Sequence, residues 1–139
     1  MSRDGLMTSG GNEMTLDRWH FMINSREDGP DTLIAEFEIR ADSPWFAGHF
    51  PGQPILPGVA ILAMAAEAIQ SFAGRRQQKV RIAGMKRVRF KLPIKPHDPV
   101  TVEVSRDGAE ATVTYIFQVR VGEEIACTGV MLTEQTGAV

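Results

Sequence analysis

The chain has 139 residues, of which 43% are hydrophobic and 23% are charged, a composition typical of a single ordinary globular domain. Its formal net charge of −2 excludes a general attraction to nucleic acid or to an anionic membrane surface. Cys127 is the only cysteine, which excludes an internal disulfide and a cysteine-based metal site. The sequence shows no apolar run long enough to cross a bilayer and nothing that resembles a signal peptide, so we expect a cytoplasmic protein.

The first third of the chain offers one clear strand. Residues 1–13 are rich in glycine and serine and predict a flexible leader, so a single domain is expected over residues 14–139. His20 lies between two aromatic residues, where packing is its expected role. Apolar and polar residues alternate over residues 33–40, which is typical of a half-buried strand. Residues 43–57 are rich in proline and glycine and predict an ordered but irregular loop.

Residues 58–72 form the one convincing helix in the sequence. This segment starts directly after Pro57, and Gly74 marks its expected end. Its first three turns carry no polar face, and a helix that is apolar all round is a buried helix. In a chain of this length, other elements must therefore wrap around it.

The rest of the sequence supplies this wrapping as strands. β-Branched and aromatic residues favour strands at residues 80–90, 100–105, 111–121 and 124–132. Asp107-Gly108 and Gly122-Glu123 are turn signals between successive strands, so we predict an antiparallel meander. The predicted fold class is α+β, with a curved antiparallel sheet wrapped around one long central helix.

The loop before the helix carries a recognisable motif. Residues 48–59 read Gly-His-Phe-Pro-Gly-Gln-Pro-Ile-Leu-Pro-Gly-Val. This run resembles the signature of the 3-hydroxyacyl-acyl-carrier-protein dehydratases, which are hot-dog-fold enzymes of fatty-acid synthesis. Residues 45–47 and 90–98 resemble the same family, and the similarity extends from about Asp17 to Glu134. The resemblance implies a hot-dog fold and a homodimer, or a larger assembly of dimers, in which the catalytic histidine of one chain meets the acid of the other.

Dehydration of a 3-hydroxyacyl thioester needs a base for the C2 proton, an acid for the departing C3 hydroxyl, and a donor that polarises the carbonyl. His49 is the expected base because an imidazole titrates near neutral pH; the alternative is a turn histidine that caps a neighbouring carbonyl. Gly58 opens the helix, where free amides favour negative charge, and the resemblance assigns the carbonyl hydrogen bond to its amide. We expect four further residues around the substrate: Phe50, Pro57, Val59 and Ala63.

The sequence departs from the family at the catalytic acid. Ala63 occupies the position that is acidic in the family, and Glu67 stands one helical turn later, where the family usually has glutamine. Residues i and i+4 share a helix face and side chains lean toward the N-terminus, so Glu67 leans toward the space beside Ala63. Burial on an apolar helix would help Glu67 to keep its proton. We therefore predict a relocated acid; the alternative is a solvated or structural side chain.

Positive charge gathers near the strand predicted at residues 80–90. Arg87, Arg89 and Lys91 are candidate contacts for an acidic carrier protein, and a solvated strand face is the alternative explanation. Arg75 and Arg76 would extend this patch, although cations at a helix end also have a local explanation.

Two other chemically distinctive side chains are expected to be structural. His97 stands in a turn where the family often has glycine, and we expect it at the surface. Cys127 lies in a strand pattern and is expected to be a small buried apolar residue.

These features predict a lyase that removes water from a 3-hydroxyacyl thioester to give a trans-2-enoyl thioester, in fatty-acid synthesis or a related lipid or polyketide pathway. The expected carrier of the substrate is the phosphopantetheine of an acyl carrier protein or coenzyme A. No metal, redox cofactor or nucleic acid is expected. Two alternatives stay open: an acyl thioesterase on the same fold, in which Glu67 activates water, and a protein that binds acyl chains or carrier proteins without turnover because Ala63 replaces the acid.

Overall fold

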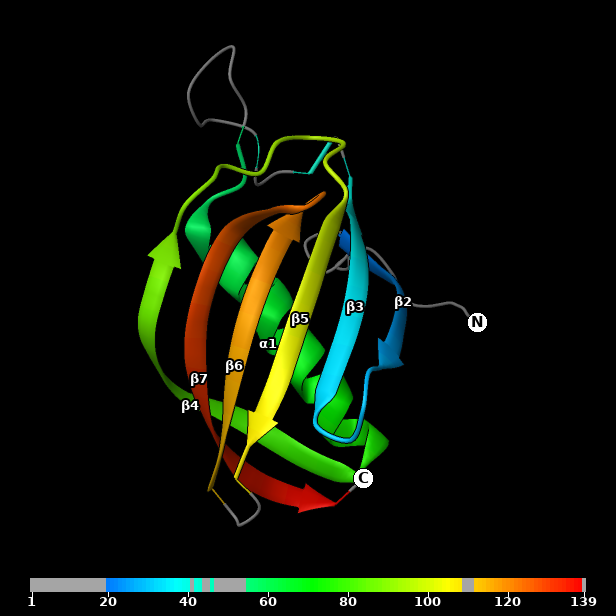
Figure 1. The fold of residues 1–139 in the computed structure, drawn as a ribbon, viewed down its shortest axis with the longest axis vertical. Coiled ribbons are helices and arrows are strands. Elements are labelled where there is room, and N and C mark those ends of the chain that lie inside the picture. The colour runs from blue at the N-terminus through cyan, green and yellow to red at the C-terminus, as the bar shows by residue number, and fades with distance from the viewer. Residues whose placement is uncertain (1–19, 41, 44–45, 47–54, 109–111, 139) are drawn as a thin grey trace, which may run out of the picture.

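The computed structural model describes residues 20–40, 42–43, 46, 55–108 and 112–138, so the predicted leader lies outside the described residues. One antiparallel sheet of six strands curves around one helix (Figure 1). The elements in chain order are β2 (His20–Glu27), β3 (Thr32–Ile39), α1 (Gly58–Arg75), β4 (Gln78–Phe90), β5 (Val100–Asp107), β6 (Thr112–Val121) and β7 (Glu124–Ala138). The prediction of an α+β fold with a sheet around one helix is confirmed.

The order of strands across the sheet is β2-β3-β5-β6-β7-β4. Strands β5, β6 and β7 form the predicted antiparallel meander, and Gly122, with a φ of 60°, makes the tight turn between the last two. The prediction is wrong for β4, which pairs with β7 at the far edge, whereas β5 pairs with β3. The connection over residues 91–99 therefore carries the chain across one end of the sheet, which lets strands from both sides close around α1 (Figure 1).

Strand β2 was not predicted. It pairs antiparallel with β3, from His20 opposite Ile39 to Glu27 opposite Leu33. Its sequence lacks a sustained alternation of apolar and polar residues, and its register shifts between Met22 and Asn24. The signal that could have revealed it is the turn that follows, where Gly29 has a φ of 83°.

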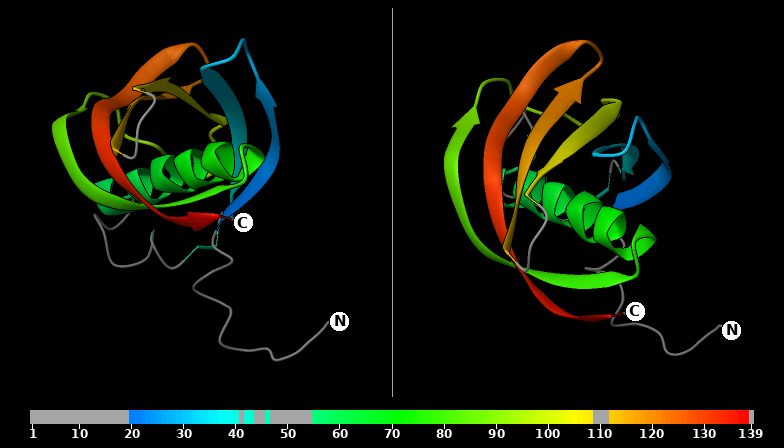
Figure 2. Two further views of the ribbon diagram at one scale, coloured as in Figure 1. Left: turned by 90° about the horizontal axis from the view of Figure 1, so that it is seen from below. Right: turned by 60° about the horizontal axis from the view of Figure 1, so that its bottom comes forward.

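The helix lies against the concave face of the sheet (Figure 2), and the core residues fill the space between this face and one side of α1. Alternate residues of each strand point inward, which places Leu33, Ala35 and Phe37 of β3 against the helix. The buried residues of the helix repeat with its period: Ala60, Ile61, Met64, Ala65, Ala68, Ile69, Phe72 and Ala73. This spacing fixes which side of α1 faces the sheet.

The opposite side of α1 is open in the isolated chain. Val59 is 61% exposed, and Ala63 and Gln70 are also exposed. The prediction of a helix buried all round is therefore wrong for a single chain, because one curved sheet covers only one side of a helix. The helix also runs past residue 72 to Arg75, and the chain leaves it at Gln77, with a φ of 59°, rather than at Gly74.

Candidate active site

An apolar groove of about 440 Å³ lies at the N-terminus of α1. It is lined by Ile55, Leu56, Pro57, Gly58, Ile61, Phe90, Lys91, Leu92 and Pro93. One wall is the segment that enters the helix, fixed by a 2.8 Å hydrogen bond from the Leu56 amide to the Ile94 carbonyl. The opposite wall is the end of β4, where the Lys91 amide donates to the Ala126 carbonyl at 2.8 Å. Backbone hydrogen bonds thus hold both walls in place.

Within the described residues, the first turn of α1 presents two amides beside this groove that donate no helical hydrogen bond, those of Gly58 and Val59. The amides of Ala60 and Ile61 donate to the Pro57 carbonyl at 3.0 and 3.3 Å, while Gly58 and Val59 precede the first helical hydrogen bond. Pro57 provides no side-chain cap, and the first turn contains no acidic residue. The positive end of the helix dipole is therefore available to stabilise an oxygen that gains negative charge.

Phe90 closely approaches the backbone of Gly58. A Cβ atom at residue 58 would lie 2.7 Å from Cζ of Phe90, closer than van der Waals contact permits. Phe90 is 53% exposed, so its ring forms a wall over the helix start that is partly open to solvent. A glycine here lets this wall and the amide at residue 58 line the same small space.

The close contact predicts a catalytic effect of Gly58→Ala. The added methyl group forces the Phe90 ring to turn, and its partial exposure lets it do so at little cost in stability. We expect kcat/KM for a 3-hydroxyacyl thioester to fall roughly 10- to 100-fold through displacement at the helix start, with the unfolding midpoint little changed. Steady-state kinetics and thermal unfolding measure the two effects.

Gly74→Ala is the matched control because a Cβ at this position of the same helix meets nothing within 4 Å. This variant should keep wild-type kinetics and gain about 0.4–1 kcal/mol of stability. Equal losses of activity in the two variants would contradict a specific role for the Gly58 contact.

Glu67 is paired with His20 rather than buried among apolar side chains. Oε1 of Glu67 lies 2.5 Å from Nε2 of His20, which is on β2. The Glu67 side chain is 44% exposed, so the expected apolar burial is absent in the isolated chain. The His20 side chain is only 10% exposed and packs against the Phe37 ring at a centroid distance of 5.7 Å. Packing of His20 was predicted, but its contact with Glu67 was not.

Val59, Ala63 and Glu67 follow one another at four-residue intervals along the open side of α1. The helix rises roughly 13.5 Å over the nine positions between residues 58 and 67. A carboxylate at Glu67 must therefore reach back toward Ala63 to approach a thioester bound at Gly58. Ala63 is exposed, and no larger side chain at this position blocks that path.

The structure brings together only part of the predicted site. Pro57 and Gly58 line the groove, whereas Val59 and Ala63 do not line it in the isolated chain. His49 and Phe50 lie outside the described residues, so their predicted roles stay predictions.

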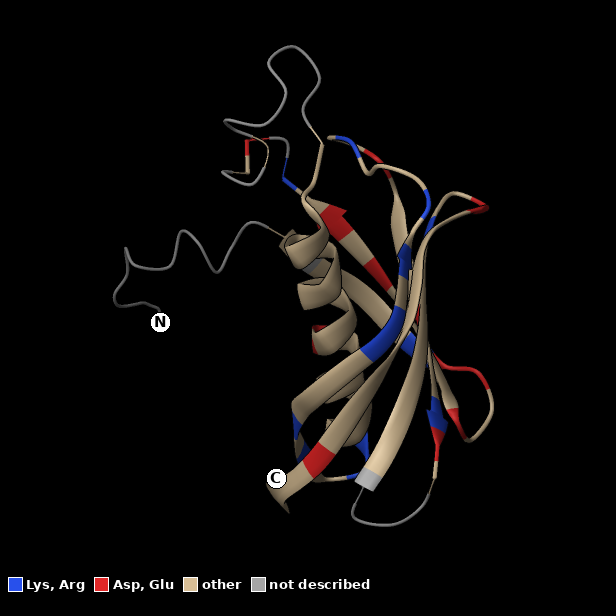
Figure 3. Ribbon diagram, turned by 90° about the vertical axis from the view of Figure 1, so that its left-hand side faces the viewer, with Lys and Arg blue, Asp and Glu red and all other residues tan. Residues whose placement is uncertain are grey.

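The candidate docking residues Arg87, Arg89 and Lys91 are all exposed, and Figure 3 shows positive residues recurring along β4. Within the described residues, none of the three forms an ion pair. Arg75 and Arg76, at the C-terminal end of α1, form contacts of their own. Arg75 donates to the carbonyl and hydroxyl of Ser25 at 3.0 and 2.7 Å.

Arg76 likewise serves the fold at the end of α1. It donates to the Pro30 carbonyl, and its guanidinium lies 4.4 Å above the centre of the Phe72 ring. Both arginines thus attach the end of the helix to the hairpin of β2 and β3, a contact that the sequence did not predict.

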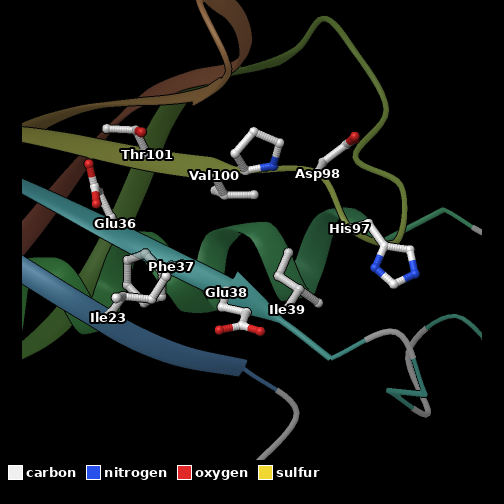
Figure 4. Close-up of a pocket in the computed structure, with 10 residues that line it drawn as sticks. Ile23, Glu36, Phe37, Glu38, Ile39, His97, Asp98, Val100 and Thr101 are labelled. Carbon is white, nitrogen blue, oxygen red and sulfur yellow. The ribbon is translucent and has the colours of Figure 1, made fainter.

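A second cavity, of about 400 Å³, has neither Gly58 nor Glu67 in its lining (Figure 4). Glu36 and Glu38 enter it from β3, and His97 and Asp98 from the turn before β5. His97 is exposed, as predicted, and its φ of 72° is a conformation that favours glycine. Across the described part of the chain, no group of three or more histidine, cysteine, aspartate or glutamate side chains could hold a metal ion.

Cys127 is fully buried in β7, as predicted, and burial raises the pKa of its thiol to about 11. The thiol therefore stays protonated near neutral pH, which makes it unsuitable as a nucleophile. Of the helices in the described residues, none combines the length and apolar character needed to span a membrane.

Residues 24–130 match the ApeI-like family, described as ApeI dehydratase, over more than half of the chain. The chain belongs to this family. A relative of this ApeI-like chain, the 3-hydroxyacyl-[acyl-carrier-protein] dehydratase FabZ of Chlamydia trachomatis, is 32% identical over 109 residues, which cover 70% of this chain and 69% of the relative. The predicted dehydratase family, and with it the hydro-lyase class, is confirmed.

Two solved structures share the fold of the ApeI-like chain. The dehydratase heterocomplex ApeI:P from Xenorhabdus doucetiae has a TM-score of 0.65 and 20% identity, over 82% of this chain and 96% of that one. A hypothetical thioesterase from Streptococcus pneumoniae, solved with coenzyme A, has a TM-score of 0.65 and 9% identity, over 86% of this chain and 90% of that one. At these identities the likeness shows the fold alone, and it confirms the hot-dog prediction.

Proposed function

We propose that this ApeI-like protein removes water from a 3-hydroxyacyl thioester and releases a trans-2-enoyl thioester. The observation that carries the proposal is the apolar groove that ends at the open amides of α1, in a chain that belongs to a dehydratase family. The groove suits an acyl chain, and the helix start suits a polarised thioester oxygen. The reaction needs no metal or redox cofactor.

Each catalytic step has a candidate residue. The Gly58 amide donates a hydrogen bond to the thioester carbonyl, which acidifies the C2 proton, and His49 removes that proton. The electrons of the C2–H bond form the C2=C3 double bond while the C3–O bond breaks. Glu67 gives its proton to the departing hydroxyl, which leaves as water.

Dimerisation would complete this site. The open side of α1 exposes apolar Val59 and Ala63, and β4, a strand of 13 residues that exposes Met85 and Phe90, is an edge strand of the sheet formed by the described residues. An edge strand beside an exposed apolar face suits a second chain, which would bring its own His49 toward Glu67. The solved relative is a heterocomplex, so the mass of the purified protein in solution distinguishes a homodimer from a chain that requires a different partner.

The carrier of the substrate is proposed to be an acyl carrier protein, with coenzyme A as the alternative. Lys91 lines the groove, and Arg87 and Arg89 lie on the strand that leads to it. Their positive charge suits an acidic carrier that threads its phosphopantetheine arm toward Gly58. We place this activity in the cytoplasm, where such carriers supply lipid or polyketide synthesis.

Product analysis tests the proposed reaction. Short- and long-chain 3-hydroxyacyl thioesters, on acyl carrier protein and on coenzyme A, are incubated with the wild type, and products are identified by mass spectrometry. We expect an enoyl thioester that is lighter by one water, and a loss of roughly 100-fold or more in kcat/KM for His49→Ala. His97→Ala is the control, because that histidine is exposed in a turn outside the groove. An unchanged rate for His49→Ala would exclude His49 as the base.

The second candidate is thioester hydrolysis, because a hypothetical thioesterase shares this fold. Glu67 is half exposed and could activate a water molecule at the open side of α1. The same assay separates the two reactions, because hydrolysis releases a free thiol and leaves the 3-hydroxyl group in place. Release of thiol without enoyl product would replace the dehydratase proposal.

A further inference from the structure

We infer that His20 is a positioning residue that orients the Glu67 carboxylate for proton transfer to the departing hydroxyl. This inference rests on the proposed function and adds a residue that lies outside the motif around residues 48–59. Its basis is the 2.5 Å contact between Nε2 of His20 and Oε1 of Glu67, which joins residues 47 positions apart in the chain.

The two side chains have complementary surroundings. The His20 side chain is 10% exposed and its ring packs on the Phe37 ring. The backbone of His20 is held in β2, where it pairs with Ile39 of β3. The Glu67 side chain is 44% exposed on the open side of α1. The imidazole is therefore the fixed member of the pair, and the carboxylate is the member that a substrate can reach.

The contact leaves one carboxylate oxygen available for chemistry. In the tautomer that carries its proton on Nε2, His20 donates to Oε1; Oε2 has no hydrogen-bond partner among the described residues. A half-exposed glutamate without this bond would sample several rotamers, so the histidine restricts Oε2 to fewer positions. A charge-assisted hydrogen bond also stabilises the carboxylate that forms as Glu67 gives up its proton.

Few other charges in the described residues face this pair. On α1 the remaining ionisable side chain is Arg75, two turns further on and directed to Ser25 and Glu27. On β3 the alternate residues Glu36 and Glu38 lie on the exposed face, opposite to buried Phe37. On β2 the other ionisable residues, Arg26 and Glu27, lie at the far end of the strand.

The proton step balances with His20 in this role. Glu67 carries the proton that passes to the C3 oxygen, the C3–O electron pair leaves with that oxygen as water, and the C2 proton passes to His49. His20 keeps its Nε2 proton throughout, while its partner Glu67 changes from a carboxylic acid to a carboxylate. It thus touches Glu67 and not the substrate.

Two substitutions of His20 separate a hydrogen-bonding role from packing. His20→Phe retains a ring against Phe37 but removes the donor, and we expect kcat to fall roughly 10- to 100-fold with KM little changed. His20→Gln restores an N–H donor near the position of Nε2, so kcat should return to within about fivefold of wild type. Wild-type kcat in His20→Phe, or no recovery in His20→Gln, would overturn the inference.

A double-mutant cycle with Glu67→Gln adds the specific test. If His20 acts through Glu67, His20→Phe should cause no further loss of kcat when Glu67 is already glutamine. The same loss in both backgrounds would show that His20 acts through general stability and would overturn the positioning role. Thermal unfolding of each variant confirms that folded protein is being assayed.

The contact can also be read without activity. We expect the ¹⁵N resonance of the His20 Nε2 atom to move in Glu67→Leu and to stay in place in Gln70→Leu, a control on an exposed residue of the same helix. If the wild type forms enoyl product but the His20 resonance does not move in Glu67→Leu, the His20 inference alone is overturned. Absence of enoyl product from the wild type overturns the proposed function, and the catalytic inference with it, whatever the resonance shows.

Discussion

Glu67→Gln is expected to lower kcat/KM for a 3-hydroxyacyl thioester by roughly 10²- to 10⁴-fold, the usual contribution of a general acid. Glutamine has nearly the size of glutamate and offers a carbonyl oxygen to the same donor, so the contact with Nε2 of His20 can persist. The variant therefore removes the transferable proton while leaving the surroundings in place. Steady-state kinetics on the carrier-bound substrate, with circular dichroism to check the fold, measure the effect.

Gln70→Ala is the control for this substitution, since Gln70 lies on the same helix, is exposed, and has no role in the proposed site. Its kcat/KM should stay within about twofold of wild type, as expected for a surface substitution. Full activity in Glu67→Gln would exclude Glu67 as the acid and would leave the proton to come from another group.

Phe72→Ala is expected to destabilise the protein by about 3–5 kcal/mol, a large part of the about 5–15 kcal/mol that holds a typical domain folded. Phe72 is fully buried in the last turns of α1, with its ring edge-on to Tyr115 of β6 at a centroid distance of 6.3 Å. Arg76 covers the ring as well, so the truncation leaves a cavity and removes two aromatic contacts.

Urea unfolding at one fixed protein concentration measures this loss, because an oligomer is stabilised by mass action. Ile116→Ala is the control: Ile116 is 51% exposed on β6, and its truncation should cost less than about 1 kcal/mol. Similar losses for the two variants would contradict the placement of Phe72 in the core.

The sequence revealed the elements whose pattern is local. The alternation in β3, the apolar run of α1 and the turn at Gly122 each follow from neighbouring residues, and the structure bears them out. The position of β4 beside β7 did not follow, because consecutive strands most often pair and only the closure of the sheet around α1 overrides this tendency. Strand β2 was not predicted because its apolar and polar residues do not alternate.

In the candidate site, too, some features follow from the local sequence and others depend on tertiary contacts. Gly58 follows from its place after Pro57 at a helix start, and the groove beside it required the tertiary contact with Phe90. The pairing of Glu67 with His20 depends on a strand that the sequence did not predict and on residues far apart in the chain. The exposure of Glu67 also depends on what covers the open side of α1, which a single chain's pattern does not specify.

The most direct measurement follows hydration of a trans-2-enoyl thioester in D₂O. If an acid and a base flank C2 and C3 of a thioester held at the start of α1, the wild type will yield a 3-hydroxyacyl thioester with one solvent deuteron at C2, and Glu67→Gln will yield almost none. Mass spectrometry of the intact thioester reads both outcomes. An enoyl thioester recovered unchanged, or converted to free thiol without deuterium at C2, would contradict this mechanism.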